Sequence, residues 1–523
     1  MFTPLKTRLT QVILVAAGAA IAMVAGSPTI RGPVAAADDL SKINHLIVIY
    51  QENWSFDSLY PHYPGANNLD GKNTAQVGLD GAALSTVPQP QHDNPKASDP
   101  GQPASLPDPA FPGPLPVAPY DLAKYVAPSA KTGDIVHRYY QQQVQIDGGK
   151  NDKYVAASDN GGLVMSYYDA QNMPEGKLAQ QYVMADNFFH SAFGGSFLNH
   201  QWLICACTPK WDSAAKPIPE AKRTVLGSDG LPTKTGDGFI TVAPDNFLVN
   251  TVQPQSTPHS SSTDPAKEAT NEAQRAPLLT DPTIGDRLND KNVSWKWYAG
   301  GWDQANTGNA DPNFQYHHQP FNYYMNYAPG TAARSDHLKD EQIFLADAAG
   351  GNLPAVSFVK PIGADNEHPG YATVLQGQQH VASLVRAVQN SPNWKDSLIL
   401  ITYDENGGRY DHVAPPKGDK WGPGSRVPGI IISPYAKTGY VDHTQYETVS
   451  VLRFIEKRFG VQALGTRDAA ANDLTNALDF SKNASSTNSA TSSLVSVLVA
   501  IAVAAVLLVI AVLVFRRRGP APS

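Results

Sequence analysis

The stretch Ile401-Thr402-Tyr403-Asp404-Glu405-Asn406-Gly407-Gly408 decides which fold this chain adopts. The aliphatic and β-branched run at residues 398–402 is typical of a buried strand, and two adjacent carboxylates and a turn signal follow it. In an open α/β sheet, ligands collect where the strands reach their carboxyl ends, so we expect Asp404 and Glu405 to serve a site. Two carboxylates this close repel each other unless a positive charge lies between them, and a divalent cation is the simplest such charge.

A second segment, near the start of the chain, has the same construction. Residues 45–50 form another short buried-strand pattern, and Glu52 and Asn53 follow it. Their oxygens are the donors that hard metal ions prefer. The alternative is structural: Asn53 or Ser55 caps the next helix, and Glu52 pairs with a surface arginine. Because the chain holds two such strand-end clusters, we favour one divalent metal ion, of unknown identity, shared between them.

The composition is that of an acidic, loop-rich globular protein. The 523 residues suffice for two or three domains. We expect a single catalytic domain over residues 38–480. The net charge of -7 offers no basic surface for nucleic acid, which we exclude as a partner. With 41 glycines and 42 prolines, the chain resembles enzymes that build their sites on long loops. Nothing in the sequence indicates an oligomeric state.

Both ends of the chain carry membrane signals. Two basic residues, an apolar run at 12–24 and small residues at 35–37 predict a signal peptide over residues 1–37, with an uncleaved anchor as the alternative. Residues 494–515 are apolar, uncharged and long enough for a transmembrane helix. The three arginines at 516–518 predict a cytoplasmic tail over residues 516–523. Residues 481–493, rich in Ser, Thr and Asn, predict a flexible stalk. We therefore expect a membrane-anchored protein whose body is extracytoplasmic.

Between these ends, strand and helix patterns alternate. Strand-like runs occur at 44–50, 293–298, 354–359, 398–402 and 427–432, and helical patterns at 125–145, 178–184, 374–388 and 449–459. Residues 207–290 predict a loop-rich insertion, and the proline-rich residues 88–119 predict an extended surface excursion. The alternation predicts an α/β fold, with a mostly parallel sheet and helices on both faces.

The chain has only two cysteines, Cys205 and Cys207, so it is not a disulfide scaffold. A bridge across a single intervening residue is expected to be strained. We therefore predict two buried thiols.

Ser196 follows a glycine pair at 194–195 and precedes an apolar, helix-compatible run. Helix N-termini present free N–H groups and the positive end of the helix dipole, which favour an anion such as phosphate. Two roles remain open for the serine. It is either a helix N-cap, the commoner role, or a nucleophile activated by a metal.

Histidines lie in several loops beside other polar residues, at His137, His317, His318, His368 and His412. A single loop histidine is usually only solvated, but several in one α/β core favour a shared site. Spacings typical of a zinc cage, such as His-Glu-x-x-His, are absent from the sequence. We therefore expect phosphate contact and acid catalysis from these residues.

Taken in order, these segments resemble the phosphoesterase family of bacterial acid phosphatases and phospholipases C. The resemblance covers residues 44–460 and implies an alkaline-phosphatase-like α/β core. The motifs that carry it are Glu52-Asn53-x-Ser55-Phe56-Asp57, Gly195-Ser196-x-x-Asn199, His317-His318-x-Pro320-Phe321, Glu367-His368-Pro369 and Tyr403-Asp404-Glu405-x-Gly407-Gly408-x-x-Asp411-His412-Val413-x-Pro415-Pro416.

The resemblance also implies roles by position. It makes Ser196 the nucleophile, with His318 or His368 as the acid that protonates the leaving group. The family commonly has arginine where this chain has Trp54, a position that we expect to face substrate. The implied metal ligands are Glu52, Asn53, Ser196, Asp404 and Glu405, and the implied substrate-binding residues are His137, Asn199, His317 and His412.

These expectations define three candidate functions. The first is metal-dependent hydrolysis of phosphate monoesters through a phosphoserine, as in acid phosphatases, on the outer face of a membrane. The alternative is a phospholipase C-type phosphodiesterase, although phospholipase members often carry C-terminal β domains that this sequence does not predict. The third is a catalytically inactive surface binding protein on the same fold. The expected partners are a phosphate-ester substrate and the membrane that holds the C-terminal helix.

Overall fold

The structure is a computed structural model, and it describes residues 39–94, 103–233, 241–259 and 271–482. The predicted signal peptide, transmembrane helix and cytoplasmic tail, and most of the stalk, lie outside these residues. Among the described residues, no helix is both long and apolar enough to cross a membrane.

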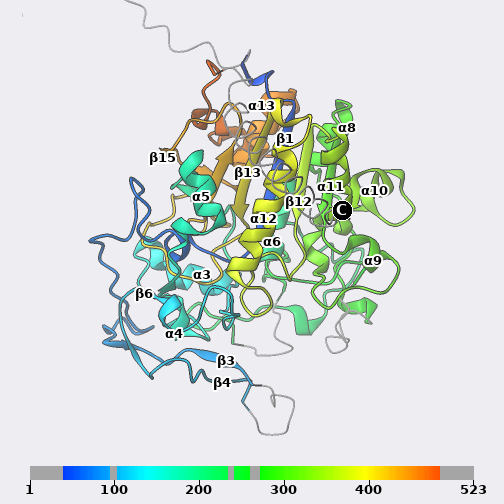
Figure 1. The fold of residues 1–523 in the computed structure, drawn as a ribbon. Helices are drawn as coiled ribbons and strands as arrows, with labels where there is room; N and C mark the ends of the chain where they lie inside the picture. The colour runs from blue at the N-terminus through cyan, green and yellow to red at the C-terminus, as the bar shows by residue number, and fades with distance from the viewer. Residues whose placement is uncertain (1–38, 95–102, 234–240, 260–270, 483–523) are drawn as a thin grey trace, which may run out of the picture.

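An eight-stranded sheet forms the centre of the molecule (Figure 1). Only β14 runs antiparallel to its neighbours, so the predicted mostly parallel sheet is confirmed. In spatial order the strands are β11 (Leu338–Asp340), β10 (Trp295–Ala299), β12 (Val356–Lys360), β1 (His45–Gln51), β13 (Ser397–Tyr403), β14 (Gly429–Ile432), β8 (Val183–Ala185) and β15 (Tyr440–Asp442).

Side-chain alternation along β1 shows that helices cover both faces of the sheet. Tyr50 points to one face, where its ring lies 5.0 Å from that of His200 on α6 (Ser196–Cys205), and α6 contacts α13 (Thr448–Phe459). The next residue, Gln51, points the opposite way. Its neighbour in the sheet, Tyr403, contacts Glu175 of α5 (Pro174–Gln181). On the same face, α5 contacts α12 (Val374–Gln389), and α12 contacts α11 (Glu341–Gly350). The predicted helices on both faces are therefore confirmed.

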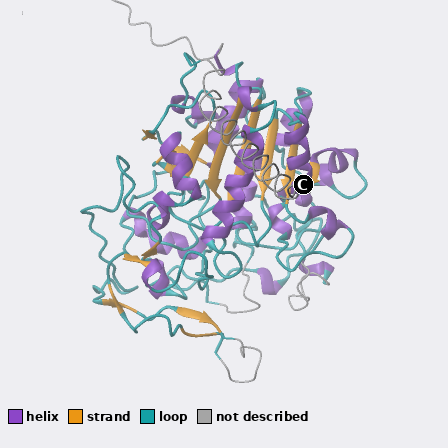
Figure 2. Cartoon of the chain, viewed as in Figure 1, coloured by secondary structure: helices purple, strands orange, loops and turns teal. Residues whose placement is uncertain are grey.

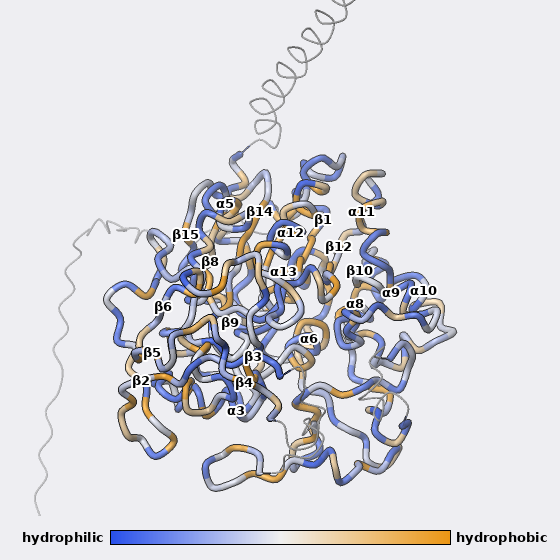
Figure 3. Tube along the Cα trace, turned by 60° about the horizontal axis from the view of Figure 1, so that its bottom comes forward, coloured by the Kyte–Doolittle hydropathy of each residue, from blue (hydrophilic) through white to orange (hydrophobic). Residues whose placement is uncertain are grey.

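Long loops gather beyond the carboxyl ends of the central strands (Figure 2). The proline-rich excursion forms two short hairpin-like pairs, β2 (Thr86–Val87) with β5 (Leu115–Pro116) and β3 (Gln91–Asp93) with β4 (Ser105–Pro107). In the region predicted as an insertion, the described residues form only 3-10 turns and α8 (Ile284–Asp290). Along the tube in Figure 3, hydrophobic colour marks the central strands, and the outer loops are mostly hydrophilic.

Two local predictions are wrong. The predicted helix 125–145 is mostly an extended segment, and a helix, α3 (Tyr139–Ile146), begins only at its end. The segment holds Pro128 and Gly133, which weaken a helix, and it carries His137 into the site described below. The pattern at 178–184 likewise spans two elements, the end of α5 and the strand β8.

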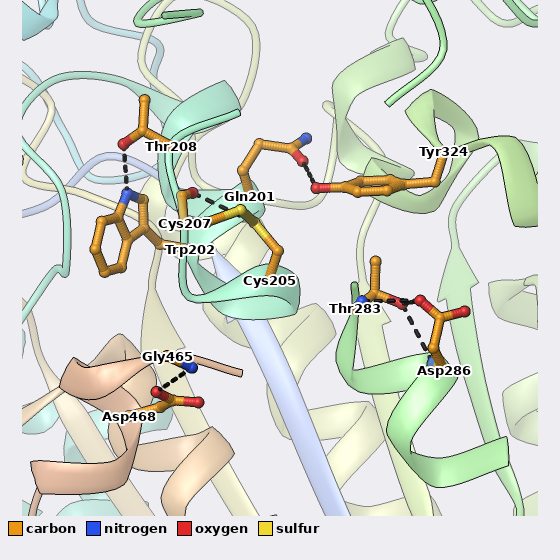
Figure 4. Close-up of a disulfide and its surroundings, with 10 residues drawn as sticks. All are labelled: Gln201, Trp202, Cys205, Cys207, Thr208, Thr283, Asp286, Tyr324, Gly465 and Asp468. Carbon is orange, nitrogen blue, oxygen red and sulfur yellow. Dashed lines mark hydrogen bonds between the residues drawn. A yellow bond between two sulfur atoms is a disulfide. The ribbon is translucent and has the colours of Figure 1, made fainter. Parts of the chain in front are cut away.

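The cysteine prediction is also wrong, because Cys205 and Cys207 form a disulfide (Figure 4). Helix α6 ends at Cys205, and Ala206 adopts the left-handed conformation with φ 49. This turn brings the two Cα atoms to 5.1 Å, within the range that a disulfide spans. Figure 4 also shows that Trp202 donates to Thr208 beside the bridge, which fixes the chain after α6.

Candidate active site

The two predicted acid clusters meet at the carboxyl ends of β1 and β13. Gln51 and Tyr403 are partners in the sheet, so the residues that follow them leave the same edge. The Asn53 N–H donates to Asp404 Oδ1 at 3.3 Å across 351 residues of sequence. Asn53 has φ 68, and a Cβ atom at Gly407 would lie 2.3 Å from the Asn53 carbonyl oxygen. The glycine after the acids is therefore what allows the two loops to touch.

Ser196 is brought to the same place by a glycine turn. It is the first residue of α6, and the N-cap is Gly195, so the N-cap role considered for Ser196 does not apply. Ser196 is only 5% exposed, and its side chain lies close enough to Asp404 to lower the pKa of that carboxyl. Asn199 holds the turn from within: its side chain accepts from Ala192 N and donates to the carbonyls of residues 192, 194 and 195. Asn199 therefore positions the serine and does not face the cavity.

Several buried oxygens at these loops lack a hydrogen bond. They are Glu52 Oε1 and Oε2, Asn53 Oδ1, Asp404 Oδ2 and Glu405 Oε1. All four residues are fully buried. A buried polar atom without a partner costs about 1–3 kcal/mol, and a charged one costs more. The set therefore calls for a positive charge that it can share.

The raised pKa values of Asp404 and Glu405 also indicate that too little positive charge lies beside these carboxylates. Burial raises the pKa of Asp404 to about 8, and the negative charge of Glu52 adds to the shift. Burial and the charge of Asp404 raise the pKa of Glu405 well above its usual range. Carboxylate, amide and hydroxyl oxygens in one place suit a hard divalent cation. Glu52, Asn53, Ser196, Asp404 and Glu405 therefore fit the predicted metal.

Glu52 also has a lysine and a histidine beside it. Lys360 Nζ lies 2.6 Å from Glu52 Oε1, and His318 Nε2 lies 2.5 Å from the same oxygen. Burial alone raises the pKa of Glu52, but His318 and Lys360 outweigh it and hold that pKa well below its usual range. His200 stacks on His318 with the ring centroids 5.3 Å apart, and the ligand atoms of Glu52, His200 and His318 lie within 4.8 Å of one another. The surroundings of Glu52 thus favour its charged form.

A cavity of about 180 Å³ opens onto the serine. It combines the predicted nucleophile with histidines, one guanidinium and two phenol rings. Its lining residues are Asp134, His137, Arg138, Ser196, Thr251, Gln315, Tyr316, His317, His368 and Tyr371.

His137 orients a predicted metal ligand. Its Nδ1 lies 2.5 Å from the carbonyl oxygen of Ile135, so Nδ1 carries the proton. Its Nε2 therefore accepts from the Asn53 amide nitrogen at 3.2 Å, which turns Asn53 Oδ1 toward the acids. Burial lowers the pKa of His137 to about 4, so the neutral ring persists near pH 7. The ring also contributes to the cavity wall.

Of the two histidines considered as the proton donor, the structure favours His368. Its Nδ1 lies 2.6 Å from the Pro369 carbonyl oxygen, its ring stacks on Tyr371, and it lines the cavity. His318 is not among the lining residues, because its Nε2 faces Glu52. His317 does line the cavity, as predicted for a residue that binds substrate.

Two residues named from the sequence lie away from the cavity. His412 Nδ1 is 2.7 Å from Asp57 Oδ2, in a buried cluster where Arg426 bridges Asp57 and Asp411. The guanidinium satisfies the acids there, so His412 serves the fold. Trp54 is 1% exposed and stacks on Arg409 at 3.9 Å, so this position does not face substrate.

Sequence reasoning missed Lys360, His200 and Arg138. Lys360 is a lysine at the end of a fully buried strand, β12, beside β1, and that unusual position was its signal. His200 was visible in the serine motif at one helical turn from Ser196, and its Nδ1 lies 2.7 Å from the Ser196 carbonyl oxygen. Arg138 had no distinctive spacing, and only the fold brings it to the cavity.

Known proteins resemble this chain over most of its length. The Phosphoesterase family matches residues 43–462. The non-hemolytic phospholipase C of Pseudomonas aeruginosa is 25% identical over 486 residues, which cover 85% of this chain and 58% of that protein. Phospholipase C A of Mycobacterium tuberculosis is 24% identical over 494 residues, 86% of this chain and 79% of that protein.

Among solved structures, the phosphonate monoester hydrolase of Agrobacterium radiobacter aligns over 83% of this chain and 77% of its own, with 8% identity and a TM-score of 0.31. The chain spans less than two thirds of the length of the Pseudomonas relative. The family match covers most of the chain, including both acid clusters, the serine turn and all the histidines of the cavity. The chain belongs to the Phosphoesterase family and is a hydrolase that acts on phosphoric ester bonds.

Proposed function

We propose that the protein is a phospholipase C-type phosphodiesterase that uses one divalent metal ion and a phosphoserine intermediate on Ser196. The sequence analysis placed phosphate monoesters first and diesters second. The relatives favour the diester, because those reported above are named phospholipases C. The observation that carries the proposal is the convergence of buried oxygens from Glu52, Asn53, Asp404 and Glu405, several of them without a hydrogen bond, beside a buried serine.

The reaction proceeds in two displacements. Ser196 Oγ attacks phosphorus, the bond from phosphorus to the diacylglycerol oxygen breaks, and His368 gives that oxygen a proton. Water then attacks the seryl phosphodiester, Oγ leaves, and the phosphorylated head group departs. Glu52, Asn53, Ser196, Asp404 and Glu405 would hold a divalent ion, which would lower the pKa of the serine hydroxyl and offset the charge that builds on phosphorus. Asn199 and the glycine turn hold Ser196 at the start of α6 throughout.

Turnover of purified, metal-loaded protein tests the proposal. We expect hydrolysis of a short-chain phosphatidylcholine, and a loss of at least about 10³-fold in kcat for Ser196→Ala. Ser383→Ala, an exposed site on α12, is the matched control and should keep full activity. Near-full activity of Ser196→Ala would disprove the nucleophile. Tight binding of the lipid without turnover in any divalent metal would point to the inactive binding protein instead.

We also propose that the body is exported and tethered by its C-terminus. The support is the signal-peptide pattern at residues 1–37 and the apolar run at 494–515. In intact cells, protease added outside should release the domain from the membrane fraction. Recovery of the whole protein in the soluble cell extract would contradict the tether.

A further inference from the structure

The cavity beside Ser196 holds one guanidinium, that of Arg138. No other Lys or Arg occurs among the residues that line it. The arginine is half-buried, and a Cβ atom built on Gly195 would lie 4.0 Å from one of its terminal nitrogens. The charge therefore lies next to the residue that precedes the nucleophile.

The backbone of Arg138 is fixed against the serine turn. Gly194 has φ 89, and a Cβ atom there would lie 2.4 Å from Tyr139 N; one on Gly195 would lie 2.7 Å from the His137 carbonyl oxygen. Tyr139 N donates to Asn250 Oδ1 at 3.1 Å, which secures the start of α3. Only glycine at both positions allows this approach, so Arg138 is held in place by the turn that presents Ser196.

A second buried cation near the site, Lys360, forms an ion pair instead of facing the cavity. Lys360 contacts Glu52 at 2.6 Å and does not line the cavity. His137 and His317 also line it, but an imidazole carries a positive charge only when it is protonated. Asp134 and Tyr316 line the same cavity, and the negative charge of Asp134 opposes the lowering of the Arg138 pKa by burial. A guanidinium stays charged at every accessible pH and matches two phosphate oxygens with its planar fork.

We propose that Arg138 binds the non-bridging oxygens of the phosphoryl group on Ser196 and thereby sets how this enzyme divides its activity between phosphate monoesters and diesters. The inference rests on the proposed phosphoryl transfer to Ser196. A monoester dianion carries one more negative charge on those oxygens than a diester, so the guanidinium stabilises the monoester more. Because of Arg138, an enzyme that hydrolyses phosphate diesters also has substantial activity toward monoesters.

The test compares two substrates with the same leaving group, p-nitrophenyl phosphate and bis(p-nitrophenyl) phosphate. In Arg138→Gln, kcat/KM should fall about 10- to 100-fold for the monoester and less than about 5-fold for the diester. Arg138→Lys should retain part of the monoester activity, because it keeps the charge and loses the fork. Arg386→Gln, at an exposed position on α12, is the control and should change neither rate.

A structural role makes a different prediction. Arg138 is the N-cap residue of α3 and makes no side-chain capping bond. If Arg138 served only the helix, kcat/KM would fall by the same factor for both substrates, and that result would overturn the proposal. A fall of less than twofold in kcat/KM for the monoester would also overturn it. The dissociation constant of inorganic phosphate on metal-loaded protein gives an answer that is independent of turnover. It should rise at least about 10-fold in Arg138→Gln, even if the wild type hydrolyses neither ester and the proposed function fails. An unchanged constant would overturn the inference.

Discussion

At the scale of single residues, a second pair of buried acids lies directly behind the site. Tyr403 OH lies 3.0 Å from Glu175 Oε2 and 3.0 Å from Glu367 Oε1, and Gln51 Nε2 donates to Glu367 Oε1 at 3.1 Å. Burial raises the pKa of Glu175 to about 7, and burial with the charge of Glu175 raises that of Glu367. The pair therefore holds a proton near neutral pH, in a position that links the Glu52 loop to the His368 loop.

This proton makes stability depend on pH. Above its ordinary pKa of 4.5 the unfolded chain releases the proton, whereas the native Glu175 keeps it up to about pH 7. The free energy of unfolding should therefore fall between pH 5 and pH 7, by at most about 3 kcal/mol from this group. Glu175→Gln cannot titrate and should flatten that slope, as measured by urea unfolding of the metal-loaded protein. Glu272→Gln, at an exposed position, is the control. Parallel slopes for wild type and Glu175→Gln would show that the pair holds no shared proton.

The sequence shows which residue types lie at the ends of the strands, but it does not show which side chains they contact. Residues 52, 53, 404 and 405 were predicted to meet, and the Asn53 N–H donates to Asp404. His412 was placed in the site because it follows that motif, yet Asp57 and Arg426 hold it elsewhere. A contact between residues more than 350 positions apart has no local pattern, so spacing alone cannot distinguish a catalytic histidine from a structural one.

At the scale of elements, the turn before Ser196 requires glycine at position 194. A Cβ atom on Gly194 would meet the start of α3, besides forcing an alanine into φ 89. Gly308 has a similar φ of 82 but open space around it. We expect Gly308→Ala to cost about 1 kcal/mol from the backbone alone, and Gly194→Ala to cost about 1–3 kcal/mol more from overlap. Urea unfolding measures both, and kcat should fall only in Gly194→Ala. Equal losses of stability would mean that α3 moves aside freely.

The elements themselves were predictable in proportion to their regularity. Helices α12 and α13 follow the spacing of their apolar residues, and the buried strands β1 and β13 follow their aliphatic runs. The segment before α3 was predicted as helix because its apolar residues fit a helical period. Its extended course is set by contacts with the serine turn, where Gly194 and Gly195 admit the backbone of residues 137–139. Tertiary contacts outweigh local propensity here.

At the scale of the whole molecule, the predicted metal ligands come mainly from the ends of two strands, β1 and β13. β1 and β13 are adjacent in the sheet although they are far apart in sequence, and α6 adds Ser196 from the segment between them (Figure 1). A cation bound there acts on the native state alone, because the unfolded chain does not assemble the five ligands. Metal binding should therefore stabilise the entire core.

Chelation gives this argument a measurable form. Removing the metal leaves Glu52, Asp404 and Glu405 buried with oxygens that lack a hydrogen bond. At a metal concentration about 100 times the dissociation constant, the lost stabilisation is about 2.7 kcal/mol, which for a body of this size corresponds to a fall of roughly 3 °C in Tm. Calorimetry with and without EDTA measures the fall, and activity should return with the Tm when metal is restored. Glu405→Gln removes one repelling charge, so the chelated variant should melt above the chelated wild type and gain less from metal. If Glu405→Gln instead lowers the Tm of the chelated protein as much as that of the loaded one, the acids are stabilised without a cation and the metal site is wrong.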